Sequence, residues 1–524
     1  MSLAGKFATV GGATFASRVL GFARETMMAA ALGTGPMADV FYAAFRFPNL
    51  FRRLFAEGAF NAAFVPLFSK EIEQSGVEGA KRFSEEVFGV LFSVLFIMTV
   101  AMELAMPLLV RFIIAPGFAD DAEKFDMTVR LASVMFPYLI CMSLMAMMSG
   151  MLNSLHRYFA AAIAPVFLNV VLIAVLGAGV YLQADPVLMA NYLAWGVLTA
   201  GLVQLAVVYF DVRRAGMRFR WRMPKITPKI RRLVALAVPA AVTGGVIQIN
   251  QIIGQAVASG KEGAISALQY ADRLYQLPLG VVGVAGGVVL LPELSRALKA
   301  GDTGEASRVQ NRTIEFVLFL TVPAAFGLMA ISPEITRVLY ERGAFGPQTT
   351  ALVAAIMTVY AFGLPAFALT KALQPAFYAR ENTKLPMRFT LIAVVINSAL
   401  AISLFPILAE RGIALAEVVS GWTNVILLAT TLILSGHLRF DKLLMRRGPL
   451  IIVSAAVMAL AVRYAAGSMS GWFTPASPFL HQLGGLVLLL LLAALVYFGL
   501  VIATGGVNKA LLARMLKRSG SGKS

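Results

Sequence analysis

The chain has very little of what soluble enzymes use for chemistry. Among its 524 residues are one cysteine, Cys141, and three scattered histidines, so neither an intramolecular disulfide nor a Cys-x-x-Cys metal site can form. Charged residues make up only 14% of the sequence, whereas soluble domains average about 25%. The sequence also lacks a Ser/His/Asp or Cys/His arrangement for nucleophilic catalysis. These shortages argue against an enzyme, and we expect neither a bound metal nor a cofactor.

Apolar residues are abundant instead. Hydrophobic residues make up 59% of the chain, and the mean hydropathy is +0.78. A membrane-spanning helix needs about 20 mostly apolar residues. Fourteen segments meet this requirement, centred near residues 19, 46, 98, 140, 170, 200, 245, 280, 320, 360, 396, 425, 457 and 491. Because their apolar runs do not alternate as barrel strands do, the sequence predicts an all-α polytopic membrane protein with 14 transmembrane helices. We expect the first helix to be retained, since its apolar run lacks the features of a signal peptide.

The net charge of +18 is concentrated in the connections between the apolar segments. The even-numbered connections are basic, as in the second (70–82) and the sixth (213–232), whereas the third (119–126) is mainly acidic. Because basic loops stay on the cytoplasmic side of a membrane, we expect both termini to be cytoplasmic. The basic residues belong to no recognisable nucleic-acid-binding module, so we expect no nucleic-acid partner.

The sequence repeats itself weakly with a shift of 226 residues. This shift aligns the stretches P-L-L-V-R-F-I-I-A-P-G-F and P-E-I-T-R-V-L-Y-E-R-G-A-F, and it pairs Pro66 with Pro292, Pro107 with Pro333, Arg111 with Arg337 and Gly117 with Gly343. A shift of six helices keeps the membrane orientation, so we expect two six-helix lobes that are parallel repeats. The predicted divisions are an N-lobe (1–212), a basic cytoplasmic linker (213–232), a C-lobe (233–437) and two added helices with a tail (438–524).

Several charged side chains interrupt the apolar runs. Arg18, for example, lies near the middle of a run from about Phe7 to Leu32. An ionised group at bilayer depth costs roughly 2.5–3.5 kcal/mol on insertion scales, so it usually faces a wet cavity. The alternative is a position near a helix end with the charge reaching the headgroups, which we expect for Arg53 and Glu57. For the others we favour a polar cavity between the lobes, where parallel-repeat transporters bind substrate.

The charges within the first, second and eighth predicted helices are mainly cationic. They are Arg18, Arg24, Arg46, Arg52 and Arg273 against Glu25, Asp39 and Asp272. This balance predicts an anionic ligand, and the planar fork of arginine suits phosphate oxygens. Two alternatives stay open: Asp39 could only neutralise Arg46 on the same helix face, and Lys371 could reach the cytoplasmic headgroups instead of a cavity.

Four motifs carry a resemblance to a known family. They read S-R-V-L-G-F-A-R-E, A-D-V-F-Y-A-A-F-R-F-P-N-L-F-R-R-L-F-A-E-G-A-F, A-P-G-F-A-D and Q-Y-A-D-R-L-Y-Q-L-P-L-G-V. With them, essentially the whole chain resembles the MurJ (MviN) family of lipid II flippases, within the larger group of multidrug/oligosaccharidyl-lipid/polysaccharide (MOP) exporters.

The resemblance implies a function and a site. The implied activity is the movement of lipid II, the undecaprenyl-pyrophosphate-linked peptidoglycan precursor, from the inner to the outer leaflet of the bacterial cytoplasmic membrane for cell-wall synthesis. It further implies a substrate-binding cavity lined by Arg18, Arg24, Asp39, Arg52 and Arg273. Further candidates for this cavity are Glu25, Arg46, Asp272 and Lys371. The two added helices would form a groove for the lipid tail, although Arg463 interrupts the first of them.

Two other classes of protein are alternatives to a lipid II flippase. A related MOP-type exporter of drugs or other lipid-linked oligosaccharides would share the two lobes but would not need this density of arginines. A membrane-embedded lipid-processing enzyme would need a nucleophile or a metal cluster. The expected partners are therefore lipid II and the membrane lipids, and the energy source, a coupling ion or the membrane potential, stays open.

Overall fold

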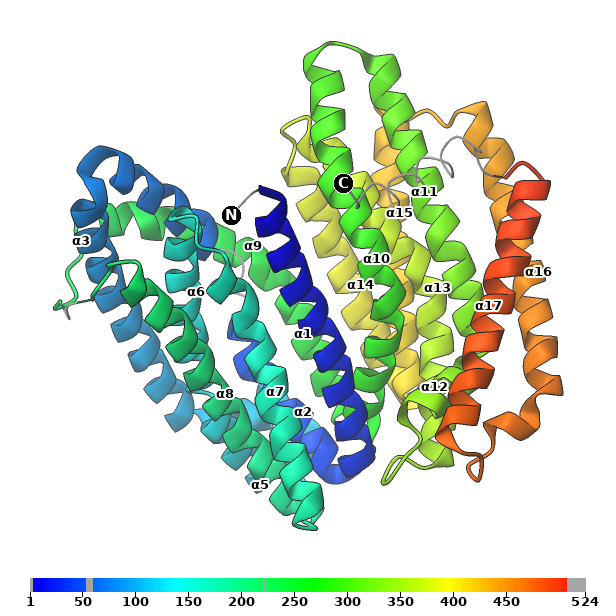
Figure 1. The fold of residues 1–524 in the computed structure, drawn as a ribbon, viewed down its shortest axis with the longest axis horizontal. Coiled ribbons are helices and arrows are strands. Elements are labelled where there is room, and N and C mark those ends of the chain that lie inside the picture. The colour runs from blue at the N-terminus through cyan, green and yellow to red at the C-terminus, as the bar shows by residue number, and fades with distance from the viewer. Residues whose placement is uncertain (1–2, 53–59, 220–221, 507–524) are drawn as a thin grey trace. The chain divides into compact units, whose positions relative to one another are not determined.

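A computed structural model of the chain describes residues 3–52, 60–219 and 222–506 (Figure 1). Within these ranges the chain forms helices joined by short connections, and it contains no strand. The first part of the chain forms α1 (Leu3–Leu32), α2 (Pro36–Arg52), α3 (Phe60–Leu104), α4 (Met106–Leu109), η2 (Val110–Ile114), η3 (Pro116–Phe118), α5 (Ala122–Met135), α6 (Tyr138–Ser154), α7 (Phe159–Tyr181) and α8 (Pro186–Arg214). The second part forms α9 (Pro228–Ala258), α10 (Ala264–Lys299), α11 (Thr303–Ala330), α12 (Ser332–Tyr340), α13 (Pro347–Tyr378), α14 (Lys384–Leu408), α15 (Glu410–Leu434), α16 (Lys442–Ser468), η4 (Ser470–Phe473) and α17 (Phe479–Ala503).

The long apolar runs account for these helices. Ten helical spans among the described residues are long and apolar enough to cross a membrane: α3, the pair α5 and α6, α7, α8, α11, and α13 to α17. The four other expected segments coincide with α1, α2, α9 and α10, which are also helical. The prediction of an all-helical membrane protein is confirmed, and fourteen crossings remain a prediction.

One expected connection is helical. The polar stretch at 70–82 lies inside α3, which is helical on both sides of Gly76. Gly76 alone has non-helical angles, φ 65° and ψ −173°, which a residue without a Cβ adopts at little cost. Lys70, Glu71 and Glu73 make this segment polar, which is why the sequence predicted a connection between two apolar helices here. A polar sequence can nevertheless continue the helix beyond its apolar part.

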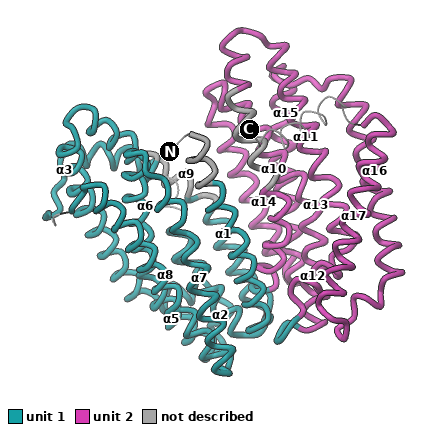
Figure 2. Tube along the Cα trace, in the orientation of Figure 1, with its two compact units in different colours: residues 1–266, 342–345 teal, residues 267–341, 346–524 magenta. Residues whose placement is uncertain are grey.

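The described chain divides into two compact units (Figure 2). Unit 1 contains residues 1–266 and 342–345, and unit 2 contains residues 267–341 and 346–524. The helix α9 belongs to unit 1, although the repeat would make it the first helix of the C-lobe. Its start is buried against α3, where Ile230 and Leu233 join a core with Phe64, Phe68 and Met151.

The segment that leads into α9 is fastened to α3 by three carboxylates. Arg222 Nε donates to Glu85 Oε2 at 2.7 Å, and Lys229 Nζ donates to Glu71 Oε2 at 2.8 Å. The Thr227 hydroxyl also donates to Glu86 at 3.1 Å and, as the N-cap of α9, accepts from Ile230 N. Two basic residues of the predicted linker, Arg222 and Lys229, therefore have carboxylate partners within unit 1.

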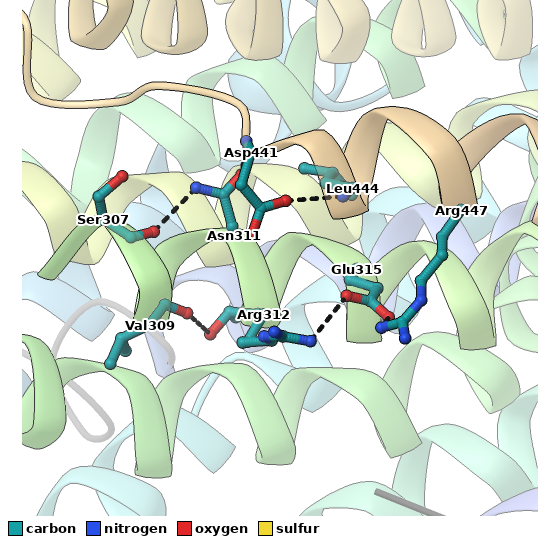
Figure 3. Close-up of polar contacts among 9 residues, drawn as sticks. Ser307, Val309, Asn311, Arg312, Glu315, Asp441, Leu444 and Arg447 are labelled. Carbon is teal, nitrogen blue, oxygen red and sulfur yellow. Dashed lines mark hydrogen bonds and ion pairs between the residues drawn. The ribbon is translucent and has the colours of Figure 1, made fainter. Parts of the chain in front are cut away.

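In unit 2, the C-terminal pair α16 and α17 packs on α11 and α12. An apolar core joins Phe319 and Val322 of α11 to residues of both added helices, and the Tyr497 hydroxyl of α17 donates to Phe319 O at 2.7 Å. Figure 3 shows the polar end of this contact, where Glu315 of α11 accepts from Arg447 of α16 at 2.7 Å. Asn311 of α11 holds the connection before α16, because it donates to Arg439 O and accepts from Asp441 N.

Candidate substrate site

A buried ion pair lies at the position of the first predicted motif. Arg24 Nη2 donates to Glu25 Oε1 at 2.5 Å, and the Tyr42 hydroxyl of α2 donates to Glu25 Oε2 at 2.7 Å. The exposed fractions are 7% for Arg24, 1% for Glu25 and 6% for Tyr42. A buried cation of this kind needs an anion beside it, since an isolated charge in a low-dielectric interior is costly.

Asp39 caps a helix instead of neutralising an arginine. Its carboxylate accepts from Gly263 N at 2.6 Å, from Ser266 N at 2.8 Å and from the Ser266 hydroxyl at 2.7 Å. These groups form the start of α10, where free N–H groups and the helix dipole favour an anion. The open alternative in which Asp39 pairs with Arg46 is wrong for the described residues, because the bonding partners of Asp39 are Gly263 and Ser266.

The other candidate arginines of unit 1 differ in exposure. Arg18 is exposed on α1, and Arg46 and Arg52 are half-buried on α2. Arg52 Nε donates to Asn49 Oδ1 at 2.8 Å, one helical turn earlier. Two expected headgroup-facing residues, Arg53 and Glu57, lie outside the described residues. Unit 1 therefore carries Arg18, Arg24 and Arg52 on two helices that are consecutive in the chain.

The remaining candidates belong to unit 2. Arg273 is half-buried on α10, and the carboxylate of its neighbour Asp272 accepts from Gln276 one turn later. Lys371 is exposed on α13, two turns before that helix ends at Tyr378. Arg463 of α16 is largely exposed and pairs with Glu334 of α12 at 3.4 Å, so its charge has a local partner.

Sequence reasoning missed two residues of this region, Tyr42 and Ser266. Both are polar groups within largely apolar helices, which is the only signal that could have drawn attention to them. Their partners could not be read from spacing, because Ser266 meets a carboxylate 227 residues away and Tyr42 meets one 17 residues away on another helix. The arrangement offers cations and hydroxyls that can hold an anion, and carboxylates that pair with the cations or cap a helix.

Comparison with known proteins identifies the family. A family model described as lipid II flippase MurJ matches residues 28–484. A probable lipid II flippase MurJ from Rhizobium tropici is 65% identical over 518 residues, which cover 99% of this chain and 97% of the relative.

Solved structures share the fold. A lipid II flippase MurJ in an inward closed conformation superposes with a TM-score of 0.76 at 24% identity, covering 94% of this chain and 97% of that one. An inward-facing multidrug resistance MATE family transporter of the MOP superfamily gives a TM-score of 0.68 at 14% identity, covering 80% of this chain and 95% of that one. Together with the family model and the close relative, this shared fold leads to one conclusion: the chain belongs to the MurJ family of lipid II flippases.

Proposed function

We propose that this protein flips lipid II from the inner to the outer leaflet of the bacterial cytoplasmic membrane by alternating access. The observation that carries the proposal is membership of the MurJ family over nearly the whole chain. The family's name describes a transporter, and translocation makes and breaks no covalent bond. Export of drugs, the runner-up, is supported here only by a fold shared with a MATE transporter at low identity.

We propose that the diphosphate of lipid II binds Arg18, Arg24, Arg52 and Arg273. A lipid diphosphate carries at least two negative charges, and arginine can bind two of its oxygens at once through charge-assisted hydrogen bonds. The buried position of Arg24 supports this role, because a low-dielectric setting strengthens attraction to an anion. Asp39 then acts as a helix-capping support beside the site, while Glu25, Arg46, Asp272 and Lys371 set the balance of charge.

The organisation we propose follows the repeat. Residues 1–212 and 233–437 are two parallel six-helix lobes joined by the basic segment 213–232, both termini are cytoplasmic, and there are fourteen crossings. Residues 438–524 add α16, α17 and a tail, and the added helices provide an apolar groove for the polyprenyl chain. Either a coupling ion or the membrane potential drives the cycle. The packing of α16 and α17 on α11 supports a fixed place for that groove within unit 2.

The test uses the purified protein in lipid vesicles with labelled lipid II. We expect lipid II to become accessible to an impermeant reagent at the opposite leaflet, faster than in vesicles without protein. Arg24→Lys keeps the charge but loses the fork, so it should slow this exchange. Arg157→Lys, at an exposed arginine between α6 and α7 that pairs with Asp211, is the matched control and should not. Vesicles in which the wild-type protein leaves lipid II on its original side would contradict the proposal.

A further inference from the structure

The Tyr42 hydroxyl, although neutral, is bonded to the ion pair of the site through Glu25. Glu25 lies between two donors: Arg24 on one carboxylate oxygen at 2.5 Å and Tyr42 on the other at 2.7 Å. The two donors differ in kind, because the arginine is a cation on α1 and the phenol is a neutral group on α2. We propose that Tyr42 is a positioning residue, which holds Glu25 in place while Arg24 exchanges this carboxylate for a phosphate oxygen of the substrate.

The exchange follows from the charges. Without substrate, the buried guanidinium of Arg24 needs an anion, and Glu25 supplies it. When a diphosphate binds Arg24, Glu25 loses its charge-assisted bond to that arginine. A carboxylate that is 1% exposed cannot recover the loss from water, so the bond from Tyr42 limits the cost of releasing Arg24.

Arg24 has unused capacity for a ligand. A guanidinium has five N–H donors, and Glu25 takes one of them at Nη2. The Nε–H of Arg24 is buried and has no acceptor among residues 3–52, 60–219 and 222–506. A phosphate oxygen at this side would satisfy a donor that has no partner in the described part of the chain.

The phenol suits this position better than other side chains would. A cation in its place would neutralise Glu25 permanently and compete with Arg24 for it, while phenylalanine would leave the carboxylate with one donor fewer. The ring of Tyr42 is held at its edge by Phe41, with centroids 5.8 Å apart and planes at 69°. This ring contact does not involve Arg24, so opening the ion pair does not remove it.

The experiment measures initial flipping rates in vesicles at increasing fractions of lipid II, for the wild-type protein and Tyr42→Phe. A hydrogen bond to a charged group is strong enough that we expect the half-saturating fraction of lipid II to rise about tenfold. In the Glu25→Gln background the side chain at position 25 is neutral and makes no charge-assisted bond with the phenol. Tyr42→Phe should therefore change half-saturation little in that background. Tyr158→Phe removes a phenol hydrogen bond to His156 in the segment between α6 and α7, and as the control it should leave half-saturation unchanged.

The outcomes separate this inference from the proposed function on which it rests. An unchanged half-saturation in Tyr42→Phe overturns the inference, and so does an equal increase in the Glu25→Gln background, which would mean that Tyr42 acts through packing alone. If Arg24→Lys leaves half-saturation unchanged, the proposed binding role of Arg24 fails. If half-saturation changes in Arg24→Lys but not in Tyr42→Phe, the positioning role of Tyr42 is wrong and the binding role of Arg24 stands.

Discussion

The ion pair between Glu315 and Arg447 should decide how firmly α16 is held to α11 (Figure 3). Their side chains are 8% and 11% exposed, and Glu315 Oε1 lies 2.7 Å from Arg447 Nη1. A second cation, Arg312, lies 3.5 Å from the other oxygen and is more exposed. We predict that Arg447→Met weakens this attachment, whereas Arg446→Met, at an exposed neighbour on the same helix, does not.

The magnitude follows from burial. Removing one partner of a buried pair costs about 3–5 kcal/mol, and Arg312 reduces this because it still faces Glu315 after Arg447 is lost. We therefore expect Arg447→Met to destabilise unit 2 by about 2 kcal/mol, which for a unit of this size lowers Tm by about 4 °C. Replacing both residues, as Glu315→Leu with Arg447→Met, leaves no buried charge and should return Tm close to the wild-type value.

The assay is thermal unfolding of the purified protein in detergent. The measured quantity is the fraction of protein that stays monodisperse after heating. The four proteins of the cycle give the coupling energy of the pair, which should be about 2 kcal/mol. If the double variant melts as low as the sum of the two single changes predicts, the two side chains do not stabilise each other and the reasoning is refuted.

Three further predictions can be checked in cells or vesicles. In a Cys141→Ala background, a cysteine at Gly35 should react with an impermeant thiol reagent from the periplasm, and one at Arg218 should not. Labelling of the cysteine at Arg218 in intact cells would show that the predicted membrane orientation is wrong. Leu491→Glu, at an exposed apolar position of α17, should slow lipid II transport at normal protein levels, and unchanged transport would argue against a tail groove there. Asp39→Asn should destabilise the protein by about 2–3 kcal/mol, measured as a lower Tm, because an amide cannot accept all three bonds from Gly263 and Ser266. An unchanged Tm would show that the helix cap by Asp39 does not stabilise the protein.

The sequence was enough to predict the helical membrane class, because continuous apolar runs leave few other solutions. It was also enough to find Arg24 and Glu25, since charges within such runs stand out. It could not give the partners of those charges. Asp39 and Arg46 share a helix face, yet Asp39 bonds to Gly263 and Ser266, more than 220 residues away. Which oxygen meets which donor depends on packing between helices, and no local pattern encodes it.

The internal repeat predicted from the sequence would account for two contacts that the order of helices does not explain. Gly117 and Gly343 are equivalent under the shift of 226, and each lies against the backbone at the end of another helix. A Cβ on Gly117 would lie 2.4 Å from Ser259 O after α9, and one on Gly343 would lie 2.3 Å from Ala30 O near the end of α1. Ser259 itself is equivalent to Gly33, which follows Ala30 by three residues. In the predicted arrangement, each glycine lies against the first helix of the other half, and such an exchanged pair of contacts is what two-fold-related repeats would require. The obstacle at both positions is backbone, which cannot move aside as a side chain can, so a residue without a Cβ is the one that fits at each.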